Sequence, residues 1–221
     1  MTEFSLRLYD DRLGAKASTG EAFKATNRVI YTREGMTSVS DSRDAATLSA
    51  NSAWFSDQDV TVSAGADGAR FLRYELVQPT DPMVLLDSED SSSGLLLDAE
   101  LDLEPGDSYL MRCDRVDIPP RGIAYTHTHQ GPGIRCLLQG GFSVETEGQK
   151  KRIAPGGAWF ESGPDPVLAS APEDRPGNFS RVMILPRALK GKSSISYVNP
   201  EDADKPKLQR YTIFIDEFIS I

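Results

Sequence analysis

The chain has 221 residues, of which 39% are hydrophobic and 26% are charged, and its formal net charge is -9. This composition is typical of a soluble globular protein, and the lack of any apolar run of some 18 residues argues against a membrane-spanning helix. The acidic charge, without a cluster of Lys and Arg, argues against a nucleic-acid partner, because neutralising phosphates requires a basic surface.

Two features of the sequence bear on location and redox state. The N-terminal stretch MTEFSLRLYDDR has no basic region followed by an apolar core, so we expect no signal peptide and a cytoplasmic protein. The two cysteines, Cys113 and Cys136, form no CxxC pair. We expect both to be reduced and buried as small apolar residues.

Short apolar runs separated by Gly and Pro follow one another along the whole chain. They are, in chain order, FSLRLY, NRVIYT, ARFLRYELV, SYLMRCDRVDI, GIRCLLQ, SRVMIL and RYTIFI. Long stretches with a period of 3.6 residues are missing. This pattern predicts an all-β barrel or sandwich.

An internal repeat divides the chain. Sliding the sequence by 105 residues places Gly35 on Gly140 and the triplet at 53–55 on the triplet at 158–160, with nine identities over the 32 ungapped positions 35–66. The two copies are expected to run from about Lys16 to Pro82 and from about Leu101 to Pro186. The chain therefore reads as two copies of one β unit.

The repeat suggests four segments. We expect a first unit at 1–82, a linker or shared strands at 83–105 with an acidic, Ser-rich exposed loop, a second unit at 106–196, and a tail at 197–221. The tail contains a closing strand, Arg210 to Ile215, which we expect to pair with the N-terminal strand, Phe4 to Tyr9. Such a pairing would tie the two units together.

The two histidines of the chain lie in GIAYTHTHQGPGIRCLLQGG, residues 122–141. Alternate residues of a strand point to the same face, so His127 and His129 can present both imidazoles inward from one element. Neutral imidazole binds Zn, Fe, Ni or Mn, and two on one strand provide half of a coordination sphere.

This stretch resembles the first sequence motif of the cupin family. The motif runs Gly, five residues, HxH, three or four residues, Glu, six residues, Gly; here Gly122 lies one residue short of the usual spacing, His127 and His129 match, and Gly140 closes the motif. PGGAWFESGPDPVLA, at 155–169, is similar to the second motif. The resemblance implies a bicupin, with two double-stranded β-helix (jelly-roll, RmlC-like cupin) barrels related by the repeat. Cupins commonly pair, so it also implies a homodimer, unless two barrels in one chain already meet that need.

The sequence departs from the family pattern at two of the four usual ligands. Gly133 replaces the metal-binding Glu, and the histidine of the second motif falls on Val167 or Leu168. In the first copy, Ala22 and Lys24 stand at the histidine positions. The resemblance thus implies a partly degenerate motif in the second barrel and no metal ligands in the first.

Three further side chains are candidates for the site. Glu161 could complete a set of two histidines and one carboxylate, which suits Fe(II) chemistry, or it could be hydrogen-bonded at its turn. The strand register turns Arg135 inward, where it would pair with Glu161 or another acid, or clamp an anionic ligand. Tyr125 should share the inward face and either donate a hydrogen bond to a ligand or only line the site.

Two other features receive a structural interpretation. Trp159 recurs at Trp54 in the copy without histidines, which indicates packing rather than catalysis. The GPG turn at 131–133 is poor in Cβ atoms, so we expect it to leave space beside the histidines.

Three functions remain open at this point. The first is a metal-dependent enzyme, with Fe, Mn, Ni or Zn on His127 and His129, Arg135 orienting a small anionic substrate, and Tyr125 or Glu161 as acid or base. Dioxygenase, isomerase, decarboxylase or lyase chemistry would be compatible with the cupin resemblance. The second is a metal-free module that binds or senses a small ligand, and the third is a structural or interaction protein.

Overall fold

A computed structural model describes residues 2–106, 108–146 and 148–221, so that Met1, Asp107 and Glu147 lie outside it. Two compact units divide the chain, Met1–Pro105 and Gly106–Ile221. No helix among the described residues has the length and apolar character needed to cross a membrane. The unit 1 strands are β1 (Thr2–Leu13), β2 (Asn27–Ser40), β3 (Ala45–Ser49), β4 (Ser52–Ser56), β5 (Thr61–Val77), β6 (Asp87–Ser88) and β7 (Ser91–Leu103).

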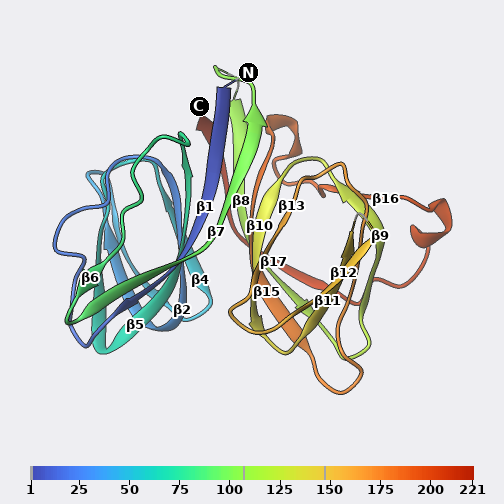
Figure 1. Cartoon of the computed structure of the whole chain (residues 1–221), viewed down its shortest axis with the longest axis horizontal. Helices are drawn as coiled ribbons and strands as arrows, with labels where there is room; N and C mark the ends of the chain where they lie inside the picture. The colour runs from blue at the N-terminus through green and yellow to red at the C-terminus, as the bar shows by residue number, and fades with distance from the viewer. Residues whose placement is uncertain (1, 107, 147) are drawn as a thin grey trace. The chain divides into compact units, whose positions relative to one another are not determined.

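Unit 1 is one curved antiparallel sheet with the order β3-β2-β5-β1-β7-β6, and β4 also pairs with β2 (Figure 1). The long strands β2 and β5 bend where Gly35 meets Gly68. Both glycines have positive φ, at 72° and 82°, and a Cβ atom on Gly35 would lie 2.2 Å from the Gly68 carbonyl oxygen. The register of β2 against β5 shifts beside this contact. Only glycine allows the approach that folds the sheet over its own core.

Unit 2 is a sandwich of two five-stranded antiparallel sheets (Figure 1). One has the order β13-β10-β15-β8-β17 and the other β12-β11-β14-β9-β16. Two short 3-10 turns, Arg187–Leu189 and Pro200–Asp202, lie between β15 and β17. Its strands are β8 (Ser108–Ile118), β9 (Ile123–His129), β10 (Gly133–Gln139), β11 (Phe142–Thr146), β12 (Gln149–Ile153), β13 (Ala158–Glu161), β14 (Val167–Ser170), β15 (Gly177–Pro186), β16 (Ile195–Tyr197) and β17 (Arg210–Ser220).

Alternation of apolar and polar residues explains where the core of unit 2 lies. On β11, Phe142 and Val144 are buried while Ser143 and Glu145 are not. Phe142 packs against Trp159 and Phe179, with ring centroids 5.7 Å and 5.4 Å away. This aromatic cluster fills one end of the space between the sheets and leaves the other end for polar side chains.

The two units share a strand order. The series β4-β2-β5-β1-β7 in unit 1 matches β13-β10-β15-β8-β17 in unit 2. Paired residues also correspond at the offset of 105 residues. Arg28 pairs with Ser56 in unit 1, and Gly133 pairs with Glu161 in unit 2. Gly35, within β2, and Gly140, directly after β10, both adopt positive φ and correspond at the same offset.

The segment 83–105, for which a linker or shared strands were expected, contains β7, a 13-residue strand that pairs along β1. On it, Leu97, Ala99, Leu101 and Leu103 alternate with polar residues. One sequence-based expectation about connections is wrong. The closing strand does not pair with the N-terminal strand. Both edges of β1 are taken, by β5 and β7, and β17 pairs with β8 instead.

Candidate metal centre

Strand β9 places the two histidines side by side. It lies between β14 and β16, and both imidazoles point from the same face of the strand into the sandwich. His127 and His129 are 6% and 5% exposed, and their ring centroids are 4.9 Å apart with the planes at 88°. The position of the pair is fixed by a rigid element rather than by a loop.

The Nδ1 atom of each histidine already has a partner. His127 Nδ1 lies 2.7 Å from the carbonyl oxygen of Tyr125, so it carries the proton and donates it there. His129 Nδ1 lies 3.2 Å from Oγ of Ser194, whose hydroxyl can itself donate toward Sδ of Met183 at 3.8 Å. The bond to Tyr125 leaves Nε2 of His127 with a lone pair, and Nε2 of His129 has one as well when its Nδ1 donates to Ser194, which is the tautomer that a metal requires.

Glu161, at the end of β13, faces the histidines. Its Oε2 lies 3.4 Å from Nε2 of His129, and Trp159 donates a hydrogen bond from Nε1 to Oε1 at 2.8 Å. The partner of Glu161 on β10 is Gly133, which has no side chain to obstruct the carboxylate. His127, His129 and Glu161 are all buried, and each offers one ligand atom within 4.8 Å of the others.

Burial keeps both histidines neutral. Desolvation lowers the pKa of His127, and its bond to the Tyr125 carbonyl and the charge of Glu161 oppose this only in part. Desolvation also lowers the pKa of His129 far below its usual range, and the positive charges of Arg135 and Arg181 lower it further. Both imidazoles are therefore available as neutral ligands at physiological pH.

Two arginines complete the polar end of the site. Arg135 is 1% exposed, contacts Oε2 of Glu161 at 2.6 Å through one nitrogen and donates to the Gly133 carbonyl at 2.6 Å through another. Opposite it on β15, Arg181 forms a two-pronged pair with Asp114 at 2.9 Å and 2.6 Å. The inward direction of Arg135 agrees with the register argument, and Glu161 is the internal partner.

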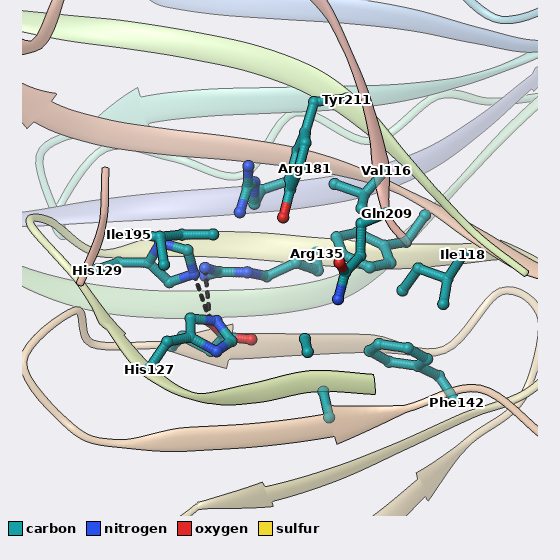
Figure 2. A pocket seen from close by; sticks show the side chains of 14 residues that line it. Val116, Ile118, His127, His129, Arg135, Phe142, Arg181, Ile195, Gln209 and Tyr211 are labelled. Atoms are coloured by element: carbon teal, nitrogen blue, oxygen red, sulfur yellow. Dashed lines mark ion pairs between the residues drawn. The ribbon is translucent and has the colours of Figure 1, made fainter. Parts of the chain in front are cut away.

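These side chains line a cavity of about 30 Å³ between the two sheets (Figure 2). His127 and His129 lie at one end of the labelled residues, and Phe142 and Ile118 lie at the other. The full lining is Val116, Ile118, Ala124, His127, His129, Arg135, Phe142, Glu161, Ala169, Phe179, Arg181, Ile195, Gln209 and Tyr211.

Tyr125 does not line this cavity, contrary to expectation. The register between β9 and β14 shifts between the pair Ala124–Ala169 and the pair His127–Val167. This irregularity breaks the alternation that was expected to turn Tyr125 inward. The ring of Tyr125 is instead contacted by the ammonium of Lys205, 4.8 Å from the ring centroid, and its carbonyl orients His127.

The GPG turn leaves no space beside the histidines. A Cβ atom on Gly131 would lie 2.2 Å from the carbonyl oxygen of Ile184, and one on Gly133 would lie 2.4 Å from that of Val182. The glycines serve a close approach of β15 instead. The expectation of a vacant volume at this turn is therefore wrong.

Sequence reasoning missed three residues of the site. Trp159 packs in the core, as its recurrence indicated, but it also holds Glu161 through its indole N–H. Arg181 could have been found from the alternation in SRVMIL, which puts an arginine opposite Arg135. Ser194 lies in a polar segment without periodicity, and no pattern in the sequence connects it with His129.

No protein-family model and no curated protein matches this sequence. Solved structures with a similar fold include a deletion mutant of the oxalate decarboxylase OxdC of Bacillus subtilis, with a TM-score of 0.63 and 12% identity over 90% of this chain and 73% of that one. The oxalate decarboxylase of Lactobacillus farciminis, solved as a formate complex, has a TM-score of 0.63 and 13% identity over 90% and 82% of the two chains.

AerE from Microcystis aeruginosa is also similar, with a TM-score of 0.57 and 12% identity over 84% of this chain and 88% of that one. At such low identity these likenesses show the fold alone. The chain has the cupin fold, and its function has to be argued from its own site.

Proposed function

We propose that unit 2 binds a divalent metal ion through His127, His129 and Glu161, and that the protein acts on or binds a small, polar, anionic metabolite beside it. The observation that carries this proposal is the convergence of three buried ligand atoms within 4.8 Å of one another. Two imidazoles and one carboxylate form a set that Fe, Mn, Ni or Zn can use.

The residues present fit a metal ion. Oε2 of Glu161 is buried, lies 3.4 Å from Nε2 of His129, and forms an ion pair with Arg135 at 2.6 Å. Both histidines have their Nδ1 atoms engaged, and Nε2 of His129 lies 3.4 Å from Oε2 of Glu161. Outer hydrogen bonds of this kind fix the orientation of metal ligands.

The metal ion and the side chains of the protein would have different roles in the chemistry of the site. A bound divalent ion would supply Lewis-acid polarisation of an oxygen of the substrate. Arg135 would orient an anionic group of the substrate, and the buried walls would exclude water. Dioxygenase, isomerase, decarboxylase or lyase chemistry all fit these parts, because the cupin fold by itself does not select a reaction.

We also propose that the chain is a bicupin, with two cupin barrels related by the internal repeat. The shared strand order and the coincident registers of β2 with β4 and β10 with β13 support this. The first barrel would then be a relative of the second that has no metal ligands at the histidine positions, where Ala22 and Lys24 stand.

Elemental analysis tests the metal proposal. Untagged protein purified without chelators should hold about one equivalent of Fe, Mn, Ni or Zn, and the His127→Ala, His129→Ala double variant should hold none. Circular dichroism and Trp159 fluorescence show whether the double variant has kept its fold. If the folded wild-type protein takes up no Fe(II), Mn(II), Ni(II) or Zn(II), the proposal is wrong.

A second function has one observation in its favour. Arg135 already neutralises Glu161 at 2.6 Å, so the site is balanced in charge without a metal. This favours a metal-free module that binds or senses a small ligand through hydrogen bonds. A protein that contains no metal but retains an organic molecule, identified by mass spectrometry after denaturation, would support that alternative.

A further inference from the structure

We infer that the outer face of unit 2 carries a second ligand site, a groove that binds the phosphate group of a small phosphate monoester. Lys150, Arg152 and Arg175 would surround the phosphate, and the neutral remainder of the ligand would lie against Ile153 and Pro172. This inference is independent of the proposed metal site, which lies between the two sheets.

The groove lies on the outer face of the sheet that contains β11, β12 and β14. Phe142 and Val144 of β11 belong to the core, so Ser143 between them points to the outer face. The register places Arg152 of β12 on one side of Ser143 and Ser170 of β14 on the other, in one row across three strands. The groove has a volume of about 460 Å³, which is enough for a small metabolite. It is lined by Gly140, Gly141, Phe142, Ser143, Lys150, Arg152, Ile153, Ser170, Ala171, Pro172 and Arg175.

The charge of this groove is opposite to that of the chain. Asp and Glu outnumber Lys and Arg by 33 to 24 in the sequence, yet the described residues that line the groove include three cations and no carboxylate. Arg175 pairs only with its exposed neighbour Asp174, a kind of surface pair that contributes little. Among the residues that the structure describes, Lys150 and Arg152 form no ion pair. All three cations are therefore available to an anion.

A close approach of two loops brings Arg175 to the groove. Gly140 has a φ of 89°, and a Cβ atom there would lie 2.2 Å from the carbonyl oxygen of Pro176. A Cβ atom on Gly141 would lie 3.3 Å from Cγ of Pro172. Because these glycines let the segment 171–176 pack against the start of β11, Arg175 joins cations that are distant from it in the sequence.

The row across the strands also contains an unsatisfied hydroxyl. Oγ of Ser143 is buried and has no hydrogen-bond partner among the described residues. A buried hydroxyl without a partner is unfavourable, and an oxygen of a bound anion would accept its hydrogen bond. Arg152, its neighbour in the row, is exposed, so its long side chain can rotate to admit the ligand and then contact it.

Unit 1 contains the same row without the charges. At the offset of 105 residues, Ser38 corresponds to Ser143 and Thr47 to Arg152. Ser38 pairs with Thr47 on one side and with Ser63 on the other, and the hydroxyl oxygens of Ser38 and Thr47 lie 3.5 Å apart. The row thus forms without a cation in unit 1. This comparison favours a ligand, rather than the stability of the sheet, as the reason for the cations in unit 2.

The number of donors favours a phosphate monoester over a carboxylate. A phosphate monoester carries about 1.5 to 2 negative charges at pH 7 and has three strong acceptor oxygens. The planar guanidinium groups of Arg152 and Arg175 suit bidentate binding of such a group. Ile153 and Pro172, at the rest of the groove, offer no charge, so the remainder of the ligand should be neutral.

The test is calorimetric titration of phenyl phosphate, inorganic phosphate and benzoate into the full chain at pH 7.5. Phenyl phosphate should bind about five- to tenfold more tightly than inorganic phosphate, because its ring covers Ile153 and Pro172. It should bind at least about tenfold more tightly than benzoate, which has one negative charge and two acceptor oxygens. Absence of binding, or equal affinity of phenyl phosphate and either other probe, would overturn the inference.

Two single variants locate the binding. Arg152→Gln and Arg175→Gln should each weaken the binding of phenyl phosphate about tenfold, and should keep the fold, measured by circular dichroism, because both side chains are exposed. Arg43→Gln is the matched control in unit 1. The side chain of Arg43 is 56% exposed and pairs with Asp57, as that of Arg175 is 60% exposed and pairs with Asp174. It makes the same change in net charge and should leave the affinity unchanged. Equal losses in all three variants, or none in the first two, would contradict the groove.

The metal-site variant separates the two proposals. The His127→Ala, His129→Ala chain should bind phenyl phosphate as tightly as wild type, because the groove lies on the other face of the sheet. A loss of binding in that chain, when folded, would place the phosphate at the metal centre and overturn the inference. Failure of the metal proposal alone, with no metal taken up by the wild-type protein, would leave the phenyl phosphate titration unchanged.

Discussion

The interiors of the two units place charged side chains in different ways. In unit 1, Arg73 is completely buried and contacts Asp11 at 2.6 Å and Glu75 at 2.9 Å. Arg28 contacts the other oxygen of Glu75 at 2.7 Å. The Arg73 guanidinium also lies over Tyr9, 4.0 Å from the ring centroid. Every carboxylate of this network faces a guanidinium, so unit 1 offers no converging ligand atoms there among its described residues.

Unit 2 uses the same strand positions for a different purpose. Gly133 and Glu161 stand where unit 1 has Arg28 and Ser56. Arg28 pairs with Glu75 in unit 1, whereas Gly133 brings no charge to the same position in unit 2, where Glu161 is paired with Arg135 and lies 3.4 Å from Nε2 of His129. The difference teaches that the two units bury ion pairs alike, and that only unit 2 places two imidazoles beside one of them.

The chain has one tryptophan in each unit, Trp54 and Trp159, so each interior can be monitored separately. The Trp159→Phe chain reports unit 1 through Trp54, and the Trp54→Phe chain reports unit 2 through Trp159.

The largest effect is expected at Glu75. Glu75→Gln removes the charge that faces Arg28 and Arg73, and leaves both guanidinium groups without this buried partner. The free energy of unfolding of unit 1, measured by urea titration with Trp54 fluorescence, should fall by about 3–5 kcal/mol. Glu34→Gln is the control. Glu34 contacts Arg70 at 3.5 Å on the surface, and its loss should cost less than about 1 kcal/mol. Equal effects of the two variants would contradict the closed network.

The cost of Glu75→Gln should depend on pH. Burial alone would raise the pKa of Glu75, but Arg73 and Arg28 outweigh it and lower the pKa below its usual value. A lowered pKa in the folded state contributes stability above the unfolded pKa of about 4.3, and this stability is lost as the pH falls through the folded pKa.

The difference between wild type and Glu75→Gln should therefore be constant from pH 7 to about pH 5 and shrink at lower pH. Burial raises the pKa of Asp11 in both proteins, and the charge of Glu75, which raises it further, is absent from the variant. A difference that grows on acidification would show that Glu75 is not held ionised by the arginines.

Metal addition should stabilise one unit and not the other. At a free metal concentration of about 100 times Kd, unit 2 should gain about 2.7 kcal/mol. Thermal unfolding of the Trp54→Phe chain, with and without Zn(II), measures this gain through Trp159. The transition reported by Trp54 in the Trp159→Phe chain should not move. A shift in unit 1 alone would contradict the assignment of the metal centre.

Part of the fold and of the candidate site could be predicted from the sequence, and part of each could not. Alternation and the cupin resemblance predicted an all-β fold and the inward faces of His127 and Arg135. The choice between a linker and shared strands at 83–105 stayed open because the Ser-rich start of β7 precedes its alternating apolar residues. The predicted inward position of Tyr125 was wrong because an irregularity in strand pairing cannot be seen in the sequence of one strand. The unit 1 network was missed because its members come from three strands, β1, β2 and β5, that only the fold brings together.

A smaller effect is expected when the support of Glu161 is removed. Trp159→Phe keeps most of the aromatic packing but removes the 2.8 Å hydrogen bond to Oε1 of Glu161. Metal affinity, measured by competition with a chelator, should fall about 10- to 100-fold. Trp54→Phe is the matched control at the repeat position and should leave metal affinity unchanged. A loss in both variants would indicate a general loss of stability.

The smallest effect is expected at Ser194. Its hydroxyl is the partner of His129 Nδ1 at 3.2 Å, while its backbone carbonyl accepts from Gln130 independently of the side chain. Ser194→Ala should therefore keep the backbone in place and reduce metal affinity about two- to tenfold, the value of one neutral hydrogen bond. Ser193→Ala, next to it but exposed, should have no effect on metal affinity. If Ser194→Ala bound metal as tightly as wild type, the orientation of His129 would come from the packing of β9 between β14 and β16 alone.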